Sequence, residues 1–199
     1  MIALADVEIV LASTSRYRRE LLSRLTGNFL CRPPRTDETP LPREQPAALA
    51  ARLAEAKARA VAADCAGAVV IGSDQVAEVD GIILGKPHTA ANARAQLAAC
   101  SAREVVFHTG ICVLDTRTGQ PRPYTALDRT CARFRQLEAD TIARYVAREQ
   151  PLDCAGSFKC EGLGIALFER IETGDPTALI GLPLIALSRL LREAGIEPI

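Results

Sequence analysis

Lysine is scarce in this sequence. Lys57, Lys86 and Lys159 are the only lysines among 24 basic residues, so arginine carries nearly all of the positive charge. A compact ammonium kept in such a background is typical of a site where a planar guanidinium does not fit. Lys57 interrupts the apolar face of an expected helix, Lys86 follows a hairpin, and Lys159 lies in a turn-like segment. For any one of them, chance placement on the solvated surface is the alternative.

Histidine is also rare, and no C-x-x-C pair occurs. His88 and His108 do not lie at zinc-ligand spacing with any cysteine, and no catalytic triad is visible. We therefore expect both histidines to have packing or surface roles. The seven cysteines favour reduced, mostly buried thiols in a reducing compartment, and hence a cytoplasmic protein.

Net charge is lacking as well, with 24 basic and 24 acidic residues. This balance argues against a protein that depends on nonspecific nucleic-acid binding, although a local basic pocket stays compatible with it. The apolar stretch at residues 9–12 follows Asp6 and Glu8 and is too short to span a bilayer, so we expect no signal peptide and no membrane partner. The length predicts one domain over residues 1–199, or one domain with two lobes, and leaves a homodimer open.

Helical and strand patterns alternate along the chain, but hairpins interrupt the alternation. The buried strand at 68–71 is expected to end in Gly72-Ser73-Asp74-Gln75, and Asp80-Gly81 predicts a tight hairpin. Further strands are expected at residues 7–11, 29–31, 105–114, 125–134 and 168–171. Helices are expected from about 16 to 27, over 47–63, 89–99 and 138–148, and at the end of the chain, with Pro183 as the first residue of the last helix. The sequence therefore predicts a mixed, partly antiparallel α/β sheet with flanking helices.

Two acids are candidates for chemistry. Asp74 is expected at the C-terminal end of the buried strand, where open α/β sheets bind ligands. A carboxylate there can hold a metal ion or take a proton from water, and a turn-forming role is the alternative. Glu38 lies in a proline-rich loop, where most acids are merely solvated. A magnesium site commonly takes one or two carboxylates plus substrate phosphates, so Glu38 and Asp74 suit such a site if the fold brings them together.

The segment that connects the first expected strand to the first expected helix has the features of an anion-binding site. Ser13 and Ser15 lie there, and backbone N–H groups at a helix N-terminus favour anions. An arginine in the first turn can grip a phosphate bidentately, which we favour for Arg18, whereas Arg19 is expected to be solvated. The segment is not a Walker A loop, which needs G-x-x-x-x-G-K. Lysines, arginines and a few carboxylates together suit a highly anionic substrate, a divalent ion and an activated water.

A set of short motifs runs in order along nearly the whole chain. Its members are LASTS (11–15) followed by Arg18 and ELL (20–22), DET (37–39), EAKA (55–58), GSDQ (72–75), GKP (85–87), TG (109–110) and GLPL (181–184). Each fragment alone is weak, but the ordered set resembles the Maf family of nucleoside triphosphate pyrophosphatases.

The resemblance implies hydrolysis of the α–β phosphoanhydride of a nucleotide, with a divalent metal such as Mg, Mn or Co. It also implies an elongated sheet with two lobes around a central cleft, as in Maf and ITPase-like folds. At the matching positions, Asp74 is implied to be the general base and Glu38 to help hold the metal. The residues implied to contact the triphosphate are Ser13, Arg18, Lys57 and Lys86.

Within the family, the chain looks most like the branch that acts on 7-methyl-GTP, on the evidence of Tyr17, Gln75 and Glu161. Methylation at N7 makes guanine cationic, and a cation over an aromatic ring gains about 0.5–2 kcal/mol. Glu161 can accept from the guanine N–H edge and offset the charge. Lys159 is an additional candidate beside this pocket. The alternatives are helix packing for Tyr17 and a loop salt bridge for Glu161.

Two departures and two alternative functions belong with this resemblance. Arg16 stands where many relatives have proline, and Tyr17 stands where the close branch can carry tryptophan, which should weaken stacking. In the pyrimidine-handling branch, arginine and glutamine commonly replace Tyr17 and Glu161, so a pyrimidine-directed or broad-specificity pyrophosphatase is the alternative enzyme. A cell-division regulator or nucleic-acid-binding protein without turnover is the alternative from another class, because the family is associated with septum formation.

Overall fold

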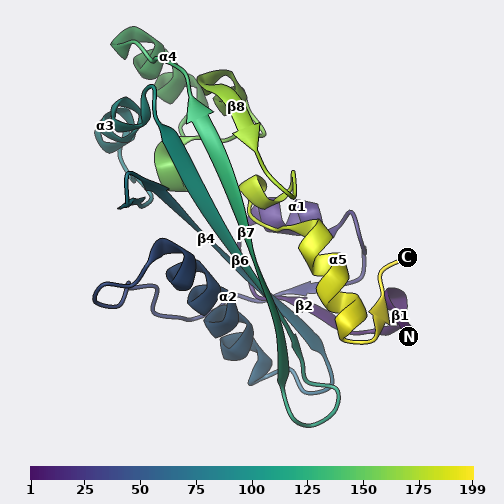
Figure 1. Cartoon of the computed structure of the whole chain (residues 1–199). Coiled ribbons are helices and arrows are strands. Elements are labelled where there is room, and N and C mark those ends of the chain that lie inside the picture. The colour runs from purple at the N-terminus through teal and green to yellow at the C-terminus, as the bar shows by residue number, and fades with distance from the viewer.

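One mixed sheet extends along the whole molecule (Figure 1). The computed structural model describes residues 1–199. The strands of the sheet are β2 (Ile9–Leu11), β3 (Leu30–Cys31), β4 (Val69–Val79), β5 (Ile82–Leu84), β6 (Glu104–Asp115), β7 (Arg122–Phe134) and β8 (Phe168–Glu172). Their order is β3-β2-β4-β6-β7-β8, with β5 paired to β4. β2 is parallel to β3 and β4, and all other pairs are antiparallel, which confirms the predicted mixed sheet.

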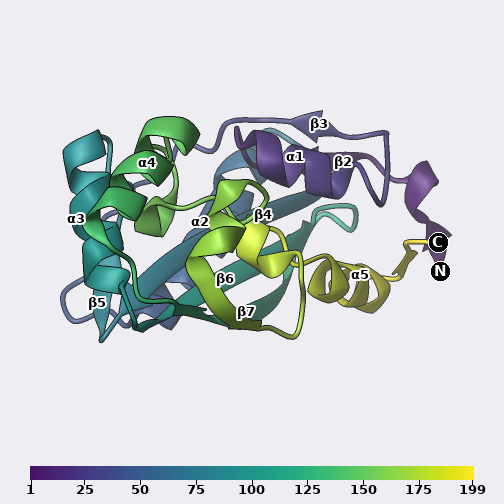
Figure 2. The same ribbon diagram turned by 90° about the horizontal axis from the view of Figure 1, so that it is seen from above.

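Helices cover both faces of this sheet. They are α1 (Arg16–Leu22), α2 (Pro46–Ala62), α3 (Ala90–Cys100), α4 (Ala139–Glu149) and α5 (Leu184–Glu193). α2 and α5 lie on opposite sides of the long strands (Figure 1), and α3 and α4 lie at the other end of the molecule from α5 (Figure 2). Side chains alternate along a strand, so Val70 and Val76 of β4 pack in the clusters of α2, whereas Ile71 and Ala77 pack in those of the opposite face.

Two glycines allow α2 to approach the sheet closely. A Cβ atom at Gly72 would lie 2.2 Å from the carbonyl oxygen of Ala54, and one at Gly110 would lie 2.4 Å from that of Ala50. Because glycine lacks this atom, helix backbone and strand backbone come into contact there. This contact brings Lys57, on the inner face of α2, against the centre of the sheet.

The hydrophobic core is divided along the length of the sheet. One cluster of 17 buried residues joins β2, α1 and α5, and includes Leu11, Leu21 and Leu187. A second cluster of 17 joins the far halves of β6 and β7 to α3 and α4, and includes Phe107 and Phe134. The middle of the sheet lies between these two cores.

The strand pairing is interrupted on one edge of β4. The last β2–β4 pair is Leu11 with Ile71, and the first β4–β5 pair is Ala77 with Leu84. Residues 72–76 of β4 therefore have a strand neighbour only in β6. The expectation that the strand ends at Gly72-Ser73-Asp74-Gln75 is wrong, because β4 continues to Val79 on its pairing with β6. Asp74 is thus in the middle of a strand, just past the point where its parallel neighbour stops.

Several local predictions are confirmed. Asp80 and Gly81 form the predicted tight hairpin, with φ values of 50° and 79°. Thr89 caps α3 by accepting a hydrogen bond from the N–H of Asn92 at 3.2 Å. All seven cysteines are free and four of them are buried. Pro183 directly precedes α5 as its N-cap and is not its first residue.

The two ends of the chain lie side by side (Figures 1 and 2). β1 (Ile2–Ala3) pairs in parallel with β9 (Ile196–Glu197) and forms a separate small sheet. None of the helices combines the length and the apolar character needed to cross a bilayer.

Candidate active site

The centre of the site is an ammonium group shared by two acids. Lys57 is 5% exposed, and its Nζ lies 2.5 Å from Oδ1 of Asp74 and 2.6 Å from Oε1 of Glu38. The three side chains come from α2, from β4 and from the loop before α2. Oδ2 of Asp74 takes part in no hydrogen bond within the protein and can accept a proton.

Hydrogen bonds to α2 hold the proline-rich loop in a position where Glu38 contacts Lys57. Arg52 of α2 donates from Nε and Nη2 to both oxygens of Glu44, at 2.6 and 2.8 Å, and from Nη2 to the carbonyl of Thr39 at 3.1 Å. The N–H of Thr39 donates to the carboxylate of Asp37 at 2.9 Å. Residues on both sides of Glu38 are therefore fixed, although Glu38 itself is half exposed.

The charge state of Glu38 follows from its surroundings. Burial raises its pKa, but the hydrogen bond and charge of Lys57, followed by the charges of Lys86 and Arg18, outweigh burial and lower the pKa below its ordinary value. Lys86 is exposed, in the segment between β5 and α3. Its positive charge contributes to the lowered pKa of Glu38, and its implied contact with a polyphosphate stays a prediction.

Arg18 enters from the first turn of α1. Ser15 caps this helix by accepting from the N–H of Arg18 at 3.4 Å, and the buried Ser13 accepts from the N–H of Ser15 at 3.1 Å. Nε of Arg18 donates to the carbonyl of Gly181 at 2.9 Å. Burial lowers the pKa of Arg18, and the charges of Asp74 and Glu38 oppose that shift. The guanidinium therefore lies within electrostatic reach of both acids.

The side chains beside Asp74 on β4 bind the segment before α5. Ser73 donates to the carbonyls of Gly110 and Gly181, at 2.8 and 2.9 Å. Gln75 donates from Nε2 to the carbonyls of Ala178 and Leu179, at 2.9 and 3.1 Å. The amide nitrogen of Gln75 is thus used within the protein, and only its carbonyl oxygen is left for a substrate.

Tyr17 and the two candidates near residue 160 lie in a second group. Burial raises the pKa of Tyr17, whereas the hydrogen bond from Arg16 and the charge of Lys159 lower it and the charge of Glu161 raises it. The charges of Lys159 and Glu161 thus act on the Tyr17 hydroxyl, and the role of all three residues in base recognition stays a prediction. Arg16 lies over that ring at 4.6 Å from its centre and donates to its hydroxyl at 2.8 Å.

Lys159 has a structural role that the sequence does not reveal. Its Nζ donates to the carbonyls of Glu149 and Gln150, at 3.1 and 3.4 Å, which are the last carbonyls of α4 and its cap. Cations at a helix C-terminus are favourable because they offset the helix dipole. Glu161 is exposed, and one of its oxygens accepts a weak hydrogen bond from Cys160 at 3.4 Å.

Sequence reasoning missed Ser73 and Asp175. Asp175 is 3% exposed and fastens the segment that carries Gly181. The available signal was the Asp-Pro-Thr run at 175–177, because an aspartate commonly bonds to the backbone two residues later. Nothing in the spacing alone indicates that this segment packs behind Asp74.

Glu38 and Asp74 are the acidic side chains at this site that could bind a metal ion. No group of three or more His, Cys, Asp and Glu side chains in residues 1–199 could hold a metal ion. Glu38 and Asp74 share a single ammonium, so two carboxylates do converge. Two protein carboxylates completed by substrate phosphates are a common magnesium arrangement, and these residues fit it.

Cationic groups and two acids lie together at the interrupted edge of β4, an arrangement that suits an anionic, phosphate-bearing ligand. Comparison with known proteins agrees. The family described as "Maf-like protein" matches residues 8–194, and the chain belongs to this family.

Two relatives of high identity share one name. A "7-methyl-GTP pyrophosphatase" of Xanthomonas oryzae pv. oryzae (strain MAFF 311018) is 58% identical, over 94% of this chain and 96% of that protein. A protein of the same name from Nitrosococcus oceani is 52% identical, over 96% and 95%. Among solved structures, the HAM1 protein from Coxiella burnetii matches 95% of this chain and 98% of its own, with a TM-score of 0.52 at 17% identity. That likeness concerns the fold alone.

Proposed function

We propose that this protein is a nucleoside triphosphate pyrophosphatase whose preferred substrate is 7-methyl-GTP. It would hydrolyse the α–β phosphoanhydride to a monophosphate and pyrophosphate. The observation that carries the proposal is the convergence of Glu38 and Asp74 on one buried ammonium, with Arg18 within electrostatic reach. The relatives named for this activity match the chain nearly end to end.

Asp74 acts as the general base. Lys57 holds Oδ1, so Oδ2 is left to accept the proton of the attacking water. The new P–O bond forms to that water oxygen as the bridging α–β P–O bond breaks, and pyrophosphate leaves. Arg18, Lys86, Lys57 and Ser13 bind the phosphate oxygens and stabilise the charge that moves onto them.

Glu38 and Asp74 are the residues that would hold a divalent cation. When bound, such a cation neutralises phosphate charge and favours loss of pyrophosphate. Lys57 would then position the two carboxylates, because it contacts both of them.

Base recognition is assigned to the Tyr17 group. The Tyr17 ring would stack on the cationic base, and Glu161 would accept from its N–H edge. Gln75 would contribute its amide oxygen only, because its nitrogen is bound to the segment before α5. Lys159 would act indirectly, through its bonds to the end of α4.

At the scale of the chain, we propose one domain whose two lobes are the two ends of the sheet, each with its own core. The site lies where β2 stops and β5 has not begun. Seven unpaired thiols support the further proposal that the protein acts in the cytoplasm. A homodimer is compatible with this arrangement and is tested by sedimentation.

The test is pyrophosphate release over a panel of nucleotides, with Mg, Mn and Co compared. We expect 7-methyl-GTP to give the highest kcat/KM, and Asp74→Asn to lose nearly all activity. Asp115→Asn is the matched control, because Asp115 is a buried strand aspartate paired with Arg117 away from the site. Activity retained by Asp74→Asn would favour a binding or division-regulating protein. Preference for pyrimidines in the wild type would favour the other enzyme branch.

A further inference from the structure

A single buried carboxylate closes the segment between β8 and α5. Oδ1 of Asp175 accepts from the N–H and the hydroxyl of Thr177, at 2.9 and 2.6 Å, and Oδ2 accepts from the N–H of Ile185 at 2.7 Å. The hydroxyl oxygen of Thr177 also accepts from the N–H of Leu184 at 2.8 Å. Asp175 therefore ties both ends of residues 175–185 together at the first turn of α5.

The closed segment presents its carbonyls to the candidate site. The carbonyl of Ala178 accepts from Gln75 and Thr109, at 2.9 and 3.1 Å. The carbonyl of Gly181 accepts from Ser73 and from Nε of Arg18, both at 2.9 Å. Gly181 has a φ of 121°, a conformation that side chains rarely adopt, so the direction of this carbonyl depends on glycine.

The bond to Gly181 determines how Arg18 is presented. A guanidinium is planar, so fixing Nε fixes the plane in which both terminal nitrogens lie. Nη1 and Nη2 of Arg18 take part in no hydrogen bond within the protein. They are therefore free for an anion, and the position of the Gly181 carbonyl decides where they point.

We propose that Asp175 is a positioning residue for polyphosphate binding, acting through the Gly181 carbonyl on Arg18. This inference rests on the proposed function, because it takes Arg18 as a phosphate contact. The carboxylate of Asp175 bonds only to Thr177 and to the N–H of Ile185, so its effect on a ligand would be indirect.

A carboxylate is required at this position because all three of its partners are donors. An asparagine can accept on one atom only, and its NH2 group would face either the Thr177 pair or the N–H of Ile185. A negative charge also suits the first turn of a helix. The charge of Asp175 also affects Asp128. Burial raises the pKa of Asp128, and the hydrogen bond from Thr130 opposes this rise. The negative charge of Asp175 raises the pKa further.

The experiment is a double-mutant cycle on binding of inorganic tripolyphosphate, measured by calorimetry on the full chain. The variants are Asp175→Asn, Arg18→Ala and the double variant, with Asp115→Asn as the control for losing a buried aspartate. We expect Asp175→Asn to weaken binding about tenfold, the loss expected when a charged hydrogen bond is misplaced. In the Arg18→Ala background, Asp175→Asn should change binding less than about twofold, because the side chain through which Asp175 acts is already absent.

Two results would overturn the inference: an equal loss in both backgrounds, or a loss of the same size in Asp115→Asn. If Asp175→Asn does not fold, Thr177→Val enters the same cycle, since it removes one of the three bonds to the carboxylate. Failure of the proposed function is seen separately, as a wild type that binds tripolyphosphate but releases no pyrophosphate from any nucleotide.

Discussion

At Lys57, one ammonium group serves two acids from different parts of the chain. Its buried position is favourable only because both carboxylates are present, since an unpaired charge in the protein interior is costly. An arginine has the same charge, but its planar fork does not match two oxygens converging on one point. The scarcity of lysine in the sequence therefore has a structural reason at this residue.

Lys57→Met should change the titration of Glu38. In the wild type the pKa of Glu38 is lowered from 4.5. The side chain therefore stays mostly ionised at pH 4.5 and is protonated only as the pH falls through the lowered pKa. Without Lys57, the two largest causes that lower the pKa of Glu38 are lost, so the pKa rises and protonation begins at higher pH. NMR titration of the Glu38 carboxyl carbon measures this, and an unchanged midpoint would contradict the pairing.

Arg16→Ala should improve recognition of a cationic base. The guanidinium of Arg16 lies over the Tyr17 ring, so a methylated guanine must compete with Arg16 for stacking on that ring. A cation–π contact at an exposed site is worth about 0.5–1 kcal/mol, which predicts a KM for 7-methyl-GTP lower by about twofold to fivefold, with GTP unchanged. Steady-state kinetics on both nucleotides test this. The effect should vanish in a Tyr17→Leu background, and its persistence there would exclude competition for the ring.

At the scale of elements, α2 and the loop before it act as one unit. The helix carries Lys57 and also carries Arg52, which holds the loop that follows Glu38 through Thr39 and Glu44. Gly72 on β4 and Gly110 on β6 allow the helix to pack closely against these two strands, the first of which carries Asp74. The geometry of the three charged groups thus depends on backbone contacts several residues away.

Gly110→Ala should move α2 away from the sheet. The added methyl would lie 2.4 Å from the carbonyl oxygen of Ala50, and overpacking of this kind costs about 1–3 kcal/mol. Both the melting temperature and kcat should fall, since Lys57 moves with the helix. Gly27→Ala is the control, because nothing lies within 4 Å of its added atom. Equal effects of Gly110→Ala and Gly27→Ala would argue against a close contact between Gly110 and α2.

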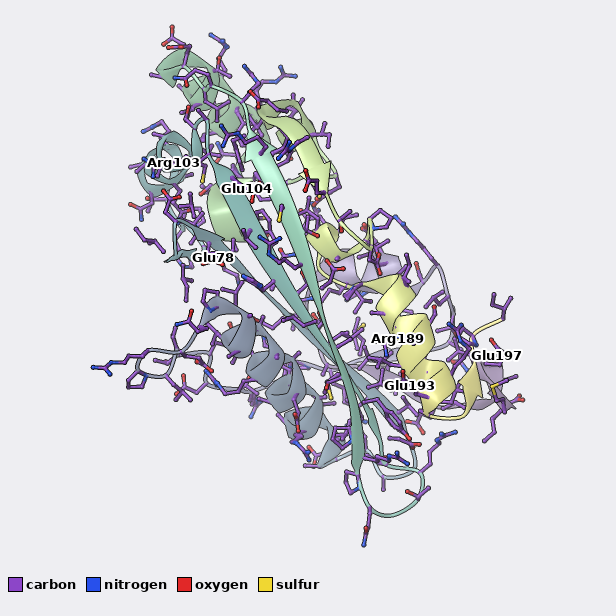
Figure 3. The ribbon with its side chains drawn as sticks, in the orientation of Figure 1. Glu78, Arg103, Glu104, Arg189, Glu193 and Glu197 are labelled. Atoms are coloured by element: carbon purple, nitrogen blue, oxygen red, sulfur yellow. The ribbon has the colours of Figure 1, made fainter.

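Glu44→Gln should loosen the loop that presents Glu38. Its hydrogen bonds with Arg52, then with the N–H of Leu41, lower the pKa of Glu44 to about 2. The anchor is therefore complete above the ordinary pKa of a glutamate and is lost only as the pH falls toward about 2. At neutral pH the variant should raise KM, measured by steady-state kinetics. The control Glu193→Gln breaks an exposed pair with Arg189 on α5 (Figure 3) and should leave KM unchanged.

At the scale of the whole molecule, two cores flank the candidate site. The far core is built around aromatic rings: Phe158 meets Phe107 at 5.1 Å, Phe168 at 5.1 Å and Phe134 at 6.0 Å between ring centres. Edge-to-face pairs of this kind add to burial. Phe158 lies directly before Lys159, so this core also holds the irregular segment that reaches Tyr17.

Phe158→Ala should destabilise the far core. Removal of a buried phenylalanine ring lowers the free energy of unfolding by about 3–5 kcal/mol. Denaturant unfolding measures the loss, and discrimination between 7-methyl-GTP and GTP should fall with it. Phe29→Ala, at a half-buried ring beside the other core, should cost less and leave discrimination intact. Equal losses in stability would mean that the four rings do not form the centre of this core.

The sequence by itself determined most of the elements and the family of the protein. Hydrophobic periodicity, Thr89 as a cap and the Asp80-Gly81 turn depend on neighbouring residues, so local physics was enough. The scarcity of lysine and the order of the motifs indicated the charged residues of the candidate site. What only the tertiary structure decided is how they meet. β4 runs on past Asp74 because β6 pairs with it, and residues 175–185 reach Arg18 across more than 150 positions of sequence. Such contacts depend on the packing of distant segments, which local sequence patterns do not encode.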